Sequence, residues 1–282
     1  MREERLGIIS PISPSSPIFP SFNFSIFQFS HFSIFQFFNF SIFQFSHFSI
    51  FQFFHLSIFP VLPVKQKTMI FQLSKALTFP DPRLGDPDGL FAVGGDLSID
   101  RLLLAYSNGI FPWYSFRDQK EILWYCPMQR FVIFPDKIHV SHSMRTLINK
   151  QEYSVSINRD FSGVIHNCSR LRYNEDGAWL GKDMIRAYTE LHRQGFAASV
   201  EVWNKEGELV GGLYGVTIGS AFFGESMFSL VPSASKLALI FLARTMQQNG
   251  GTLIDCQLET PHLKSMGGEY ISYDRYMEIL KN

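Results

Sequence analysis

The chain has 282 residues, with 25 Lys and Arg side chains against 25 Asp and Glu, three Cys and 30 Phe. Residues 1–68 hold 17 of the Phe but only four basic and two acidic groups, which leaves 21 basic and 23 acidic groups in residues 69–282. This near-neutral balance excludes a polybasic chain, so any contact with nucleic acid must use a local patch. The three Cys are odd in number and form no C-x-x-C pair, which argues against disulfides and a thiolate zinc site and fits a cytoplasmic protein.

Residues 1–68 form a low-complexity segment. The hexamer F-S-I-F-Q-F begins at Phe24, Phe32, Phe40 and Phe48, and this spacing fits neither a solenoid unit nor the period of a helix or a strand. The segment is uncharged over more than the ~20 residues of a membrane span, but Ser, Gln, Asn, His and Pro interrupt it throughout. We therefore expect no membrane anchor, no folded domain before residue 69, and a working protein that begins at Met69.

Residues 69–150 predict a small α+β domain. Pro and Gly residues between 80 and 89 indicate an extended lead-in, and Ser98 then stands where it would cap a short helix that ends before Gly109. Strands are predicted at 121–125 and 130–134, followed by a helix at 141–149.

Residues 151–282 show a different order of elements. The predicted series is a helix at 182–194, three strands at 198–203, 208–218 and 220–224, a helix at 236–248 and a strand at 252–257. The three strands form an antiparallel meander, and the crossover helix lets the last strand return parallel beside the third. This order predicts an α+β domain of the GNAT-like (N-acetyltransferase-like) kind, with a cleft where neighbouring strands splay apart.

Several kinds of chemistry lack their motifs. There is no phosphate loop, dinucleotide fingerprint or H-E-x-x-H. The segment 229–236, S-L-V-P-S-A-S-K, has no glycine with which to cradle the pyrophosphate of CoA before a helix. His139 and His142 form one possible pair of metal ligands, and His166 and Cys168 form another. Neither pair has a third ligand at a spacing typical of a metal site. We therefore expect neither a metal nor a cofactor.

Three clusters remain as candidate sites, each with two interpretations. Glu225 in F-F-G-E-S-M-F-S is either desolvated beside a cation or at the water-facing end of a strand. Asp255 in L-I-D-C-Q-L shares a strand face with Gln257, whose amide would orient the carboxylate, unless that face belongs to a solvent-facing edge strand. Trp113 in G-I-F-P-W-Y-S either stacks on a base or walls an apolar pocket, or else it packs between subdomains.

Seven segments in order resemble the leucyl/phenylalanyl-tRNA–protein transferase family, from about Phe71 to the end of the chain. They are D-G-L-F-A-V-G-G-D-L-S (88–98), G-I-F-P-W-Y-S (109–115), I-L-W-Y-C-P (122–127), E-L-V-G-G-L-Y-G-V (208–216), F-F-G-E-S-M-F-S (222–229), A-S-K-L-A-L (234–239) and L-I-D-C-Q (253–257). The family's F-P-x-P stands at 79–82, close behind Met69. The resemblance implies a small N-terminal domain and a GNAT-like C-terminal domain.

The resemblance also implies an activity and its site. Such an enzyme moves Leu or Phe, and less readily Met, from aminoacyl-tRNA to the α-amine of a protein whose first residue is Arg or Lys, which marks that protein for the N-degron pathway. The positions that match residues shaping the aminoacyl-adenosine site are Trp113, Trp179, Glu225 and Ile254. Asp255 and Gln257 match the reaction centre, where Asp255 would hold the ammonium and accept or relay its proton.

Departures from the family leave some points open. Leu213 and Met246 stand where relatives often carry other apolar groups, which leaves the preference among Leu, Phe and Met open. The stretch 140–151 carries only Arg145 and Lys150 as candidate tRNA contacts, where relatives can be more basic. An acyl-CoA-dependent N-acetyltransferase and a non-catalytic module that binds tRNA or peptide are the alternative interpretations.

Overall fold

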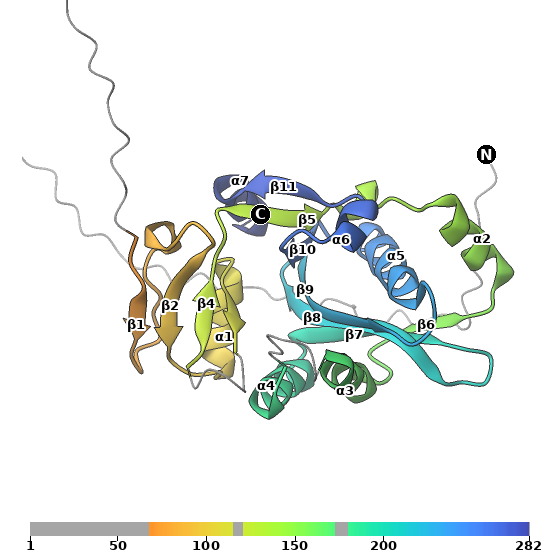
Figure 1. The fold of residues 1–282 in the computed structure, drawn as a ribbon, viewed down its shortest axis with the longest axis horizontal. Helices are drawn as coiled ribbons and strands as arrows, with labels where there is room; N and C mark the ends of the chain where they lie inside the picture. Colours follow the sequence, from red (N-terminus) through yellow and green to blue (C-terminus); the bar gives the residue numbers. More distant parts are fainter. Residues whose placement is uncertain (1–67, 115–120, 173–179, 282) are drawn as a thin grey trace, which may run out of the picture. The chain divides into compact units, whose positions relative to one another are not determined.

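Two β-sheets organise residues 68–114, 121–172 and 180–281, which are the residues that the computed structural model describes (Figure 1). The smaller sheet has four strands in the order β1-β2-β4-β3, with β1 parallel to β2 and the other pairs antiparallel. Its strands are β1 (Phe71–Leu73), β2 (Leu90–Gly94), β3 (Phe111–Trp113) and β4 (Leu123–Tyr125), and the short helix η1 (Pro82–Leu84) lies between β1 and β2.

Helix α1 (Ile99–Ser107) connects β2 to β3 and confirms the helix predicted after Ser98. Ser98 is the N-cap residue, and its backbone N–H donates to the Asp96 side chain at 2.9 Å. Beyond the C-terminal end of the helix, Gly109 adopts a φ of 71°, and a Cβ at this position would lie 2.6 Å from the ring of Tyr276. Both the turn and the close packing therefore require glycine.

The larger sheet has seven strands in the order β11-β5-β10-β9-β8-β7-β6. All neighbours are antiparallel except β9 and β10, which are parallel. Its strands are β5 (Gln129–Ile133), β6 (Ser154–Ile157), β7 (Ala197–Trp203), β8 (Leu209–Ile218), β9 (Ala221–Ser229), β10 (Leu253–Gln257) and β11 (Glu269–Ser272).

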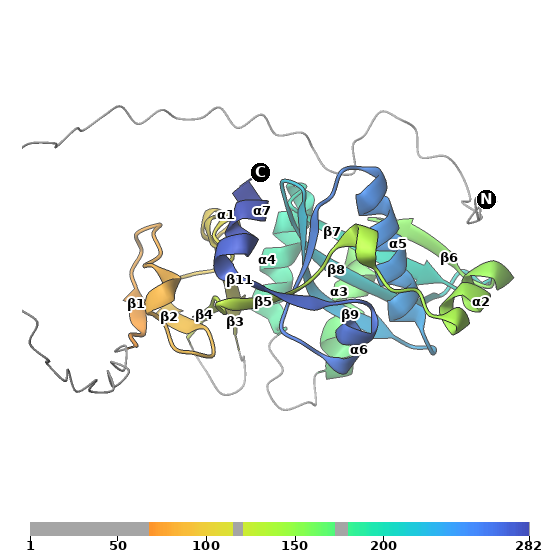
Figure 2. The same cartoon turned by 90° about the horizontal axis from the view of Figure 1, so that it is seen from above.

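Helices cover both faces of this sheet. Helix α5 (Ala234–Gln248) packs on β7, β8 and β9 from one side, and α3 (Phe161–Arg172) and α4 (Lys182–Arg193) lie on the opposite side (Figure 1). Figure 2 shows α7 (Tyr273–Lys281) beside β5 and β11. The remaining helices are η2 (Pro135–Lys137), α2 (His142–Lys150) and α6 (Pro261–Ser265).

The series α4, β7, β8, β9, α5, β10 is the order that the sequence predicted for a GNAT-like domain, and it is confirmed together with the parallel return of the last strand. Strand β10 pairs with β9 only from Leu253 to Asp255, opposite Ala221 to Phe223. Beyond Phe223, β9 continues to Ser229 without β10 beside it. The predicted splay between these two strands is therefore present.

Strand β5 lies in the larger sheet, although the sequence placed it within a domain spanning residues 69–150. Four of its five residues are buried, and it pairs with β10 on one side and β11 on the other. Because residues on both faces of this strand are buried, it belongs in the interior of a covered sheet, which explains this placement. The chain thus passes from the small sheet to the large one between Tyr125 and Gln129.

Several elements were not predicted, namely β1, β2, β3, β6, β11, α3, α6, α7 and the short helices η1 and η2. No helix among the described ranges combines the length and the apolar character needed to cross a bilayer.

Candidate active site

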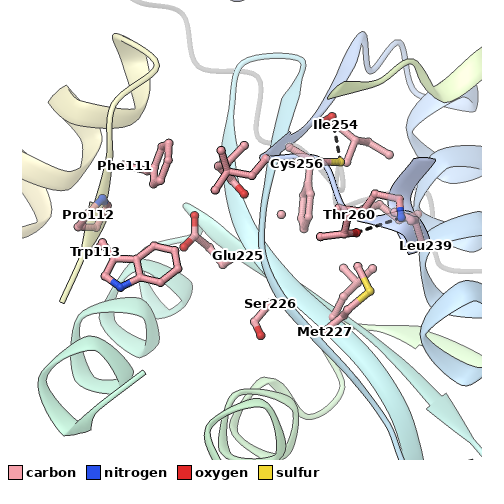
Figure 3. A pocket seen from close by; sticks show the side chains of 17 residues that line it. Phe111, Pro112, Trp113, Glu225, Ser226, Met227, Leu239, Ile254, Cys256 and Thr260 are labelled. Carbon is pink, nitrogen blue, oxygen red and sulfur yellow. Dashed lines mark hydrogen bonds between the residues drawn. The ribbon is translucent and has the colours of Figure 1, made fainter. Parts of the chain in front are cut away.

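The splay between β9 and β10 opens into an apolar pocket of about 250 Å³ (Figure 3). Its apolar wall combines residues from β8, β9, α5, β10 and α6, namely Leu213, Phe222, Met227, Leu239, Leu242, Ile254 and Leu263. Phe111, Pro112 and Trp113 of β3 close the pocket from the small sheet. Glu225 and Gln257 are among the few polar residues in the lining. The arrangement suits a ligand that has an apolar end and a polar end.

Glu225 projects from β9 into a cluster with two tyrosines. Tyr106 of α1 donates to Oε1 and Tyr188 of α4 donates to Oε2, both at 2.7 Å, and the two tyrosine oxygens lie 2.6 Å apart. Burial raises the pKa of Glu225 to about 7, although both hydrogen bonds lower it. Glu225 is half-buried in the middle of β9, so it is not at the water-facing end of the strand. Its hydrogen-bond partners are two tyrosines and not the expected cation.

Asp255 is completely buried, which excludes the solvent-facing edge strand. Its Oδ2 accepts hydrogen bonds from Arg130 Nε at 3.0 Å and from the Tyr276 hydroxyl at 2.6 Å. Its Oδ1 accepts the backbone N–H of Gln257 at 2.8 Å. Burial is the largest single effect on Arg130 and opposes its charge, but the Asp255 carboxylate together with Tyr276 and Cys126 outweighs burial and raises the pKa of the guanidinium.

The expected bond from the Gln257 side-chain amide to the Asp255 carboxylate is wrong. A register shift falls between the two residues in the pairing of β10 with β5, and Gln257 has a φ of 58°, so the simple alternation of a strand ends at this point. The Gln257 Nε2 atom instead lies 3.5 Å from the backbone oxygen of Asp255. The bulge turns Gln257 to line the pocket while Asp255 stays beneath it.

Trp113 lines the pocket and also a second hollow of about 760 Å³, and the two hollows share Phe111, Trp113 and Leu258. The Trp113 ring lies edge-on to the Tyr125 ring, with the centroids 6.4 Å apart. The second hollow is bordered largely by apolar and aromatic side chains, including Tyr125 and Tyr270, and by the carboxylate of Asp88.

Other predicted residues fall in different places. Ile254 lines the pocket, whereas Trp179 lies outside the described residues. Arg145 and Lys150 are exposed on α2, and neither lines the pocket. Of the two positions that leave the substrate preference open, Leu213 lines the pocket, whereas Met246 is buried in α5 away from the lining.

Arg130, Tyr276, Tyr106 and Tyr188 were missed by the sequence analysis. A signal existed only for Arg130, a charged residue directly before the apolar run 131–133. The tyrosines fit ordinary buried helix faces, so nothing in the local pattern distinguishes them.

Two further chemistries find no support in the described ranges. Cys256 lines the pocket, but burial, reinforced by Asp255, raises the pKa of its thiol well above the usual range, so it is a poor nucleophile. No group of three or more His, Cys, Asp or Glu residues is arranged there to hold a metal ion.

Comparison with known proteins gives consistent matches along residues 95–281. The sequence models of the leucyl/phenylalanyl-tRNA protein transferase and of its N-terminal domain match residues 132–281 and 95–128. The leucyl/phenylalanyl-tRNA–protein transferase of Syntrophobacter fumaroxidans is 48% identical over 212 residues, which cover 75% of this chain and 89% of that protein. The protein of the same name from Pseudomonas fluorescens is 50% identical over 207 residues, covering 73% and 90% of the two chains.

Solved structures give weaker matches. A GCN5-related N-acetyltransferase from Sphaerobacter thermophilus matches with a TM-score of 0.31 and 10% identity, over 67% of this chain and 60% of that one. L-PGS from Bacillus licheniformis matches with a TM-score of 0.35 and 11% identity, over 61% and 54% of the two chains.

Proposed function

The chain belongs to the leucyl/phenylalanyl-tRNA–protein transferase family and is therefore an aminoacyltransferase, and from this premise we propose how its pocket performs the reaction. The donor is tRNA charged with Leu or Phe, and the acceptor is the α-amine of a protein that begins with Arg or Lys. The product would carry the N-terminal residue that the N-degron pathway recognises. Both substrates are found in the cytoplasm. The observation that supports this best is an apolar pocket with Glu225 and Gln257 in its lining.

The aminoacyl side chain occupies the apolar part of the pocket. Leu and Phe branch no earlier than Cγ, so they can enter between the walls formed by Leu213, Leu239 and Ile254. Val and Ile carry a second heavy atom on Cβ, which is crowded and stiff near the ester. A difference of one methylene or methyl group in such a pocket discriminates by roughly 1 to 3 kcal/mol.

The terminal adenosine of the tRNA lies along Trp113. Trp113 borders both hollows. An adenosine bound in the second hollow would therefore place the aminoacyl ester on its ribose at the apolar pocket. Tyr125 and Tyr270 supply further aromatic surface in the second hollow. A base stacked on an aromatic ring gains about 1 to 3 kcal/mol. By its position in the sequence, Trp179 is assigned to the same adenosine site.

The reaction centre lies at Gln257, with Asp255 as its support. An aminoacyl ester is already activated, so the protein mainly has to place the amine about 3 to 3.5 Å from the ester carbonyl, which is worth roughly 7 to 11 kcal/mol. The Gln257 side-chain oxygen accepts a hydrogen bond from the incoming amine. Asp255 fixes the backbone of Gln257 through Oδ1, so we assign Asp255 as a positioning residue.

Helix α2 contributes to the binding of the tRNA backbone. Arg145 and Lys150 are exposed on this helix, and the Lys150 Nζ atom lies 4.0 Å from the Glu152 carboxylate. Two cations make a small patch, which agrees with a near-neutral chain that binds RNA locally.

A donor comparison tests this proposal. The full chain is incubated with an Arg-headed peptide and, in separate reactions, with Leu-tRNA, Phe-tRNA, Val-tRNA or acetyl-CoA. We expect turnover with the first two, at least about tenfold slower transfer of Val, and none with acetyl-CoA. Acetylation without aminoacyl transfer would refute the proposal.

A further inference from the structure

Formation of the peptide bond releases a proton that neither reaction-centre residue is able to take. Asp255 has no exposed surface and does not line the pocket, so an amine in the pocket does not reach its carboxylate, which is paired with the Arg130 cation. The side chain of Gln257 is a neutral amide and not a base. The α-amine has a pKa of about 7.7 to 8.0, so at pH 7 about nine tenths of it arrives as ammonium. A different acceptor is needed.

The contacts of Glu225 with Tyr106 and Tyr188 form a closed ring in which protons can be counted. Three oxygen pairs lie within hydrogen-bond distance, at 2.6, 2.7 and 2.7 Å. An ionised Glu225 leaves two hydroxyl protons for these three contacts. A protonated Glu225 supplies the third, and Glu225, Tyr106 and Tyr188 then each donate once around the ring. The ring can therefore take up one added proton, and when Glu225 is ionised both tyrosines donate to its carboxylate.

The surroundings of Glu225 favour exchange of that proton near neutral pH. The side chains that act on it are Tyr106 from α1, Tyr188 from α4, and Asp255 and Arg130 from β10 and β5, while Tyr214 of β8 packs edge-on against Tyr188. Burial and Asp255 raise the pKa of Glu225, whereas the tyrosine hydrogen bonds and Arg130 lower it, and the result is about 7. This value lies within about one unit of the pKa of the α-amine, which is the match that general base catalysis requires.

We propose that Glu225, held by Tyr106 and Tyr188, is the catalytic group that takes the proton from the acceptor amine and returns it to the ribose oxygen. The inference rests on the proposed function, because the amine must meet the ester in the pocket that Glu225 lines. The neutral form of the amine, about a tenth of the total at pH 7, attacks the ester carbonyl carbon through its nitrogen and forms the C–N bond. The proton that this nitrogen must then lose passes to the Glu225 carboxylate. The C–O bond then breaks, its electron pair goes to the ribose oxygen, and Glu225 protonates that oxygen. Glu225 ends the cycle ionised.

The test is the pH profile of single-turnover transfer from Leu-tRNA to an Arg-headed peptide, with both substrates saturating. The full chain is compared with its Glu225→Gln variant, which keeps a donor and an acceptor for the ring. Every variant should lose rate as the pH falls through the pKa of the α-amine, about 7.7 to 8.0. Wild type should lose rate again through a second midpoint at about 7, the wild-type midpoint. Glu225→Gln should be slower by at least about 100-fold and should lack this midpoint. Tyr106→Phe removes a bond that lowers the pKa of Glu225, so its midpoint should move to higher pH.

Glu190→Gln is the matched control, because Glu190 is on the same helix as Tyr188 and pairs with Arg193 away from the ring. Its profile should equal that of wild type. The inference is overturned if Glu225→Gln keeps the wild-type midpoint, or if it raises only the KM for the peptide. A Tyr106→Phe midpoint that does not move also overturns it, even where Glu225→Gln fails to fold. A wild-type chain that transfers no Leu at any pH refutes the proposed function instead.

Discussion

Arg130 and Asp255 form an ion pair in which neither side chain has more than 1% of its surface exposed, and Nε and Nη2 of Arg130 each lie 3.0 Å from Oδ2. Arg130 Nη2 also donates to the backbone oxygen of Gly109 at 2.6 Å, just before the strand that carries Trp113. The pair therefore connects β10, the strand that carries Gln257, to the wall of the pocket formed by the small sheet.

Loss of the Asp255 side chain should lower the stability of the protein as well as the rate of aminoacyl transfer. Asp255→Ala leaves Arg130 buried without its countercharge, which costs about 3 to 5 kcal/mol of unfolding free energy. Tyr276→Phe removes only one hydrogen bond to the carboxylate, and the unfolding free energy should fall by about 1 to 3 kcal/mol. Urea unfolding measures both variants, and equal stability of Asp255→Ala and wild type would contradict the role assigned to the pair.

The sequence predicted those parts of this arrangement that depend on local patterns. Ser98 and Ser141 are N-caps of predicted helices, and the meander with its parallel return strand follows from alternating apolar residues and a crossover helix. Asp255 and Glu225 were identifiable because each interrupts an apolar run.

The rest depends on contacts between distant segments. Arg130 is 125 positions from Asp255, and Tyr106 is 119 positions from Glu225, so no local pattern relates them. The conformation of Gln257 is part of a bulge against β5, a strand that the sequence assigned to the other domain. The alternation of side chains along a regular strand therefore predicted a hydrogen bond from the Gln257 side-chain amide to the Asp255 carboxylate. In the structure the backbone N–H of Gln257 makes that hydrogen bond instead.

The size of the pocket should set the donor preference. Leu213→Ala shortens a side chain of the wall, and we expect the ratio of Phe to Leu transfer to rise several-fold because the larger ring gains room. Leu237→Ala is the matched control, since Leu237 is buried in α5 but does not line the pocket. Competition between equal amounts of Phe-tRNA and Leu-tRNA measures this ratio. If the ratio changed equally in Leu213→Ala and Leu237→Ala, Leu213 would not be a residue that selects the aminoacyl side chain.

The salt dependence of tRNA binding should show the contribution of α2. Arg145→Gln combined with Lys150→Gln should weaken binding and lower the slope of log affinity against log salt by about 1 for each phosphate that the variant no longer neutralises. Lys205→Gln, in the exposed turn between β7 and β8, should leave the slope unchanged. Titration of charged tRNA between ~50 and 200 mM salt measures this. An unchanged slope in the double variant would exclude these two cations from the tRNA-binding surface.

Glu225 should make the free protein less stable at alkaline pH. Its pKa is about 7 in the folded chain and about 4.3 when unfolded. The folded state therefore binds the extra proton between these values, and the stabilisation present below pH 4 is lost as the pH rises through 7. Relative to wild type, Glu225→Gln should be more stable at pH 8 than at pH 5.5 by about 1 to 2 kcal/mol. Denaturant unfolding at the two pH values measures this, and an equal difference at both would contradict the raised pKa.

The central claim is that the α-amine of a basic N-terminus attacks the ester of a charged tRNA in the pocket between β9 and β10. The most direct measurement supplies the full chain with tRNA carrying labelled Leu and with an Arg-headed peptide, either free or acetylated on its α-amine. We expect the free peptide to gain one labelled Leu at its N-terminus and the acetylated peptide to gain none. Absence of label from both peptides, or equal label in both, would contradict it.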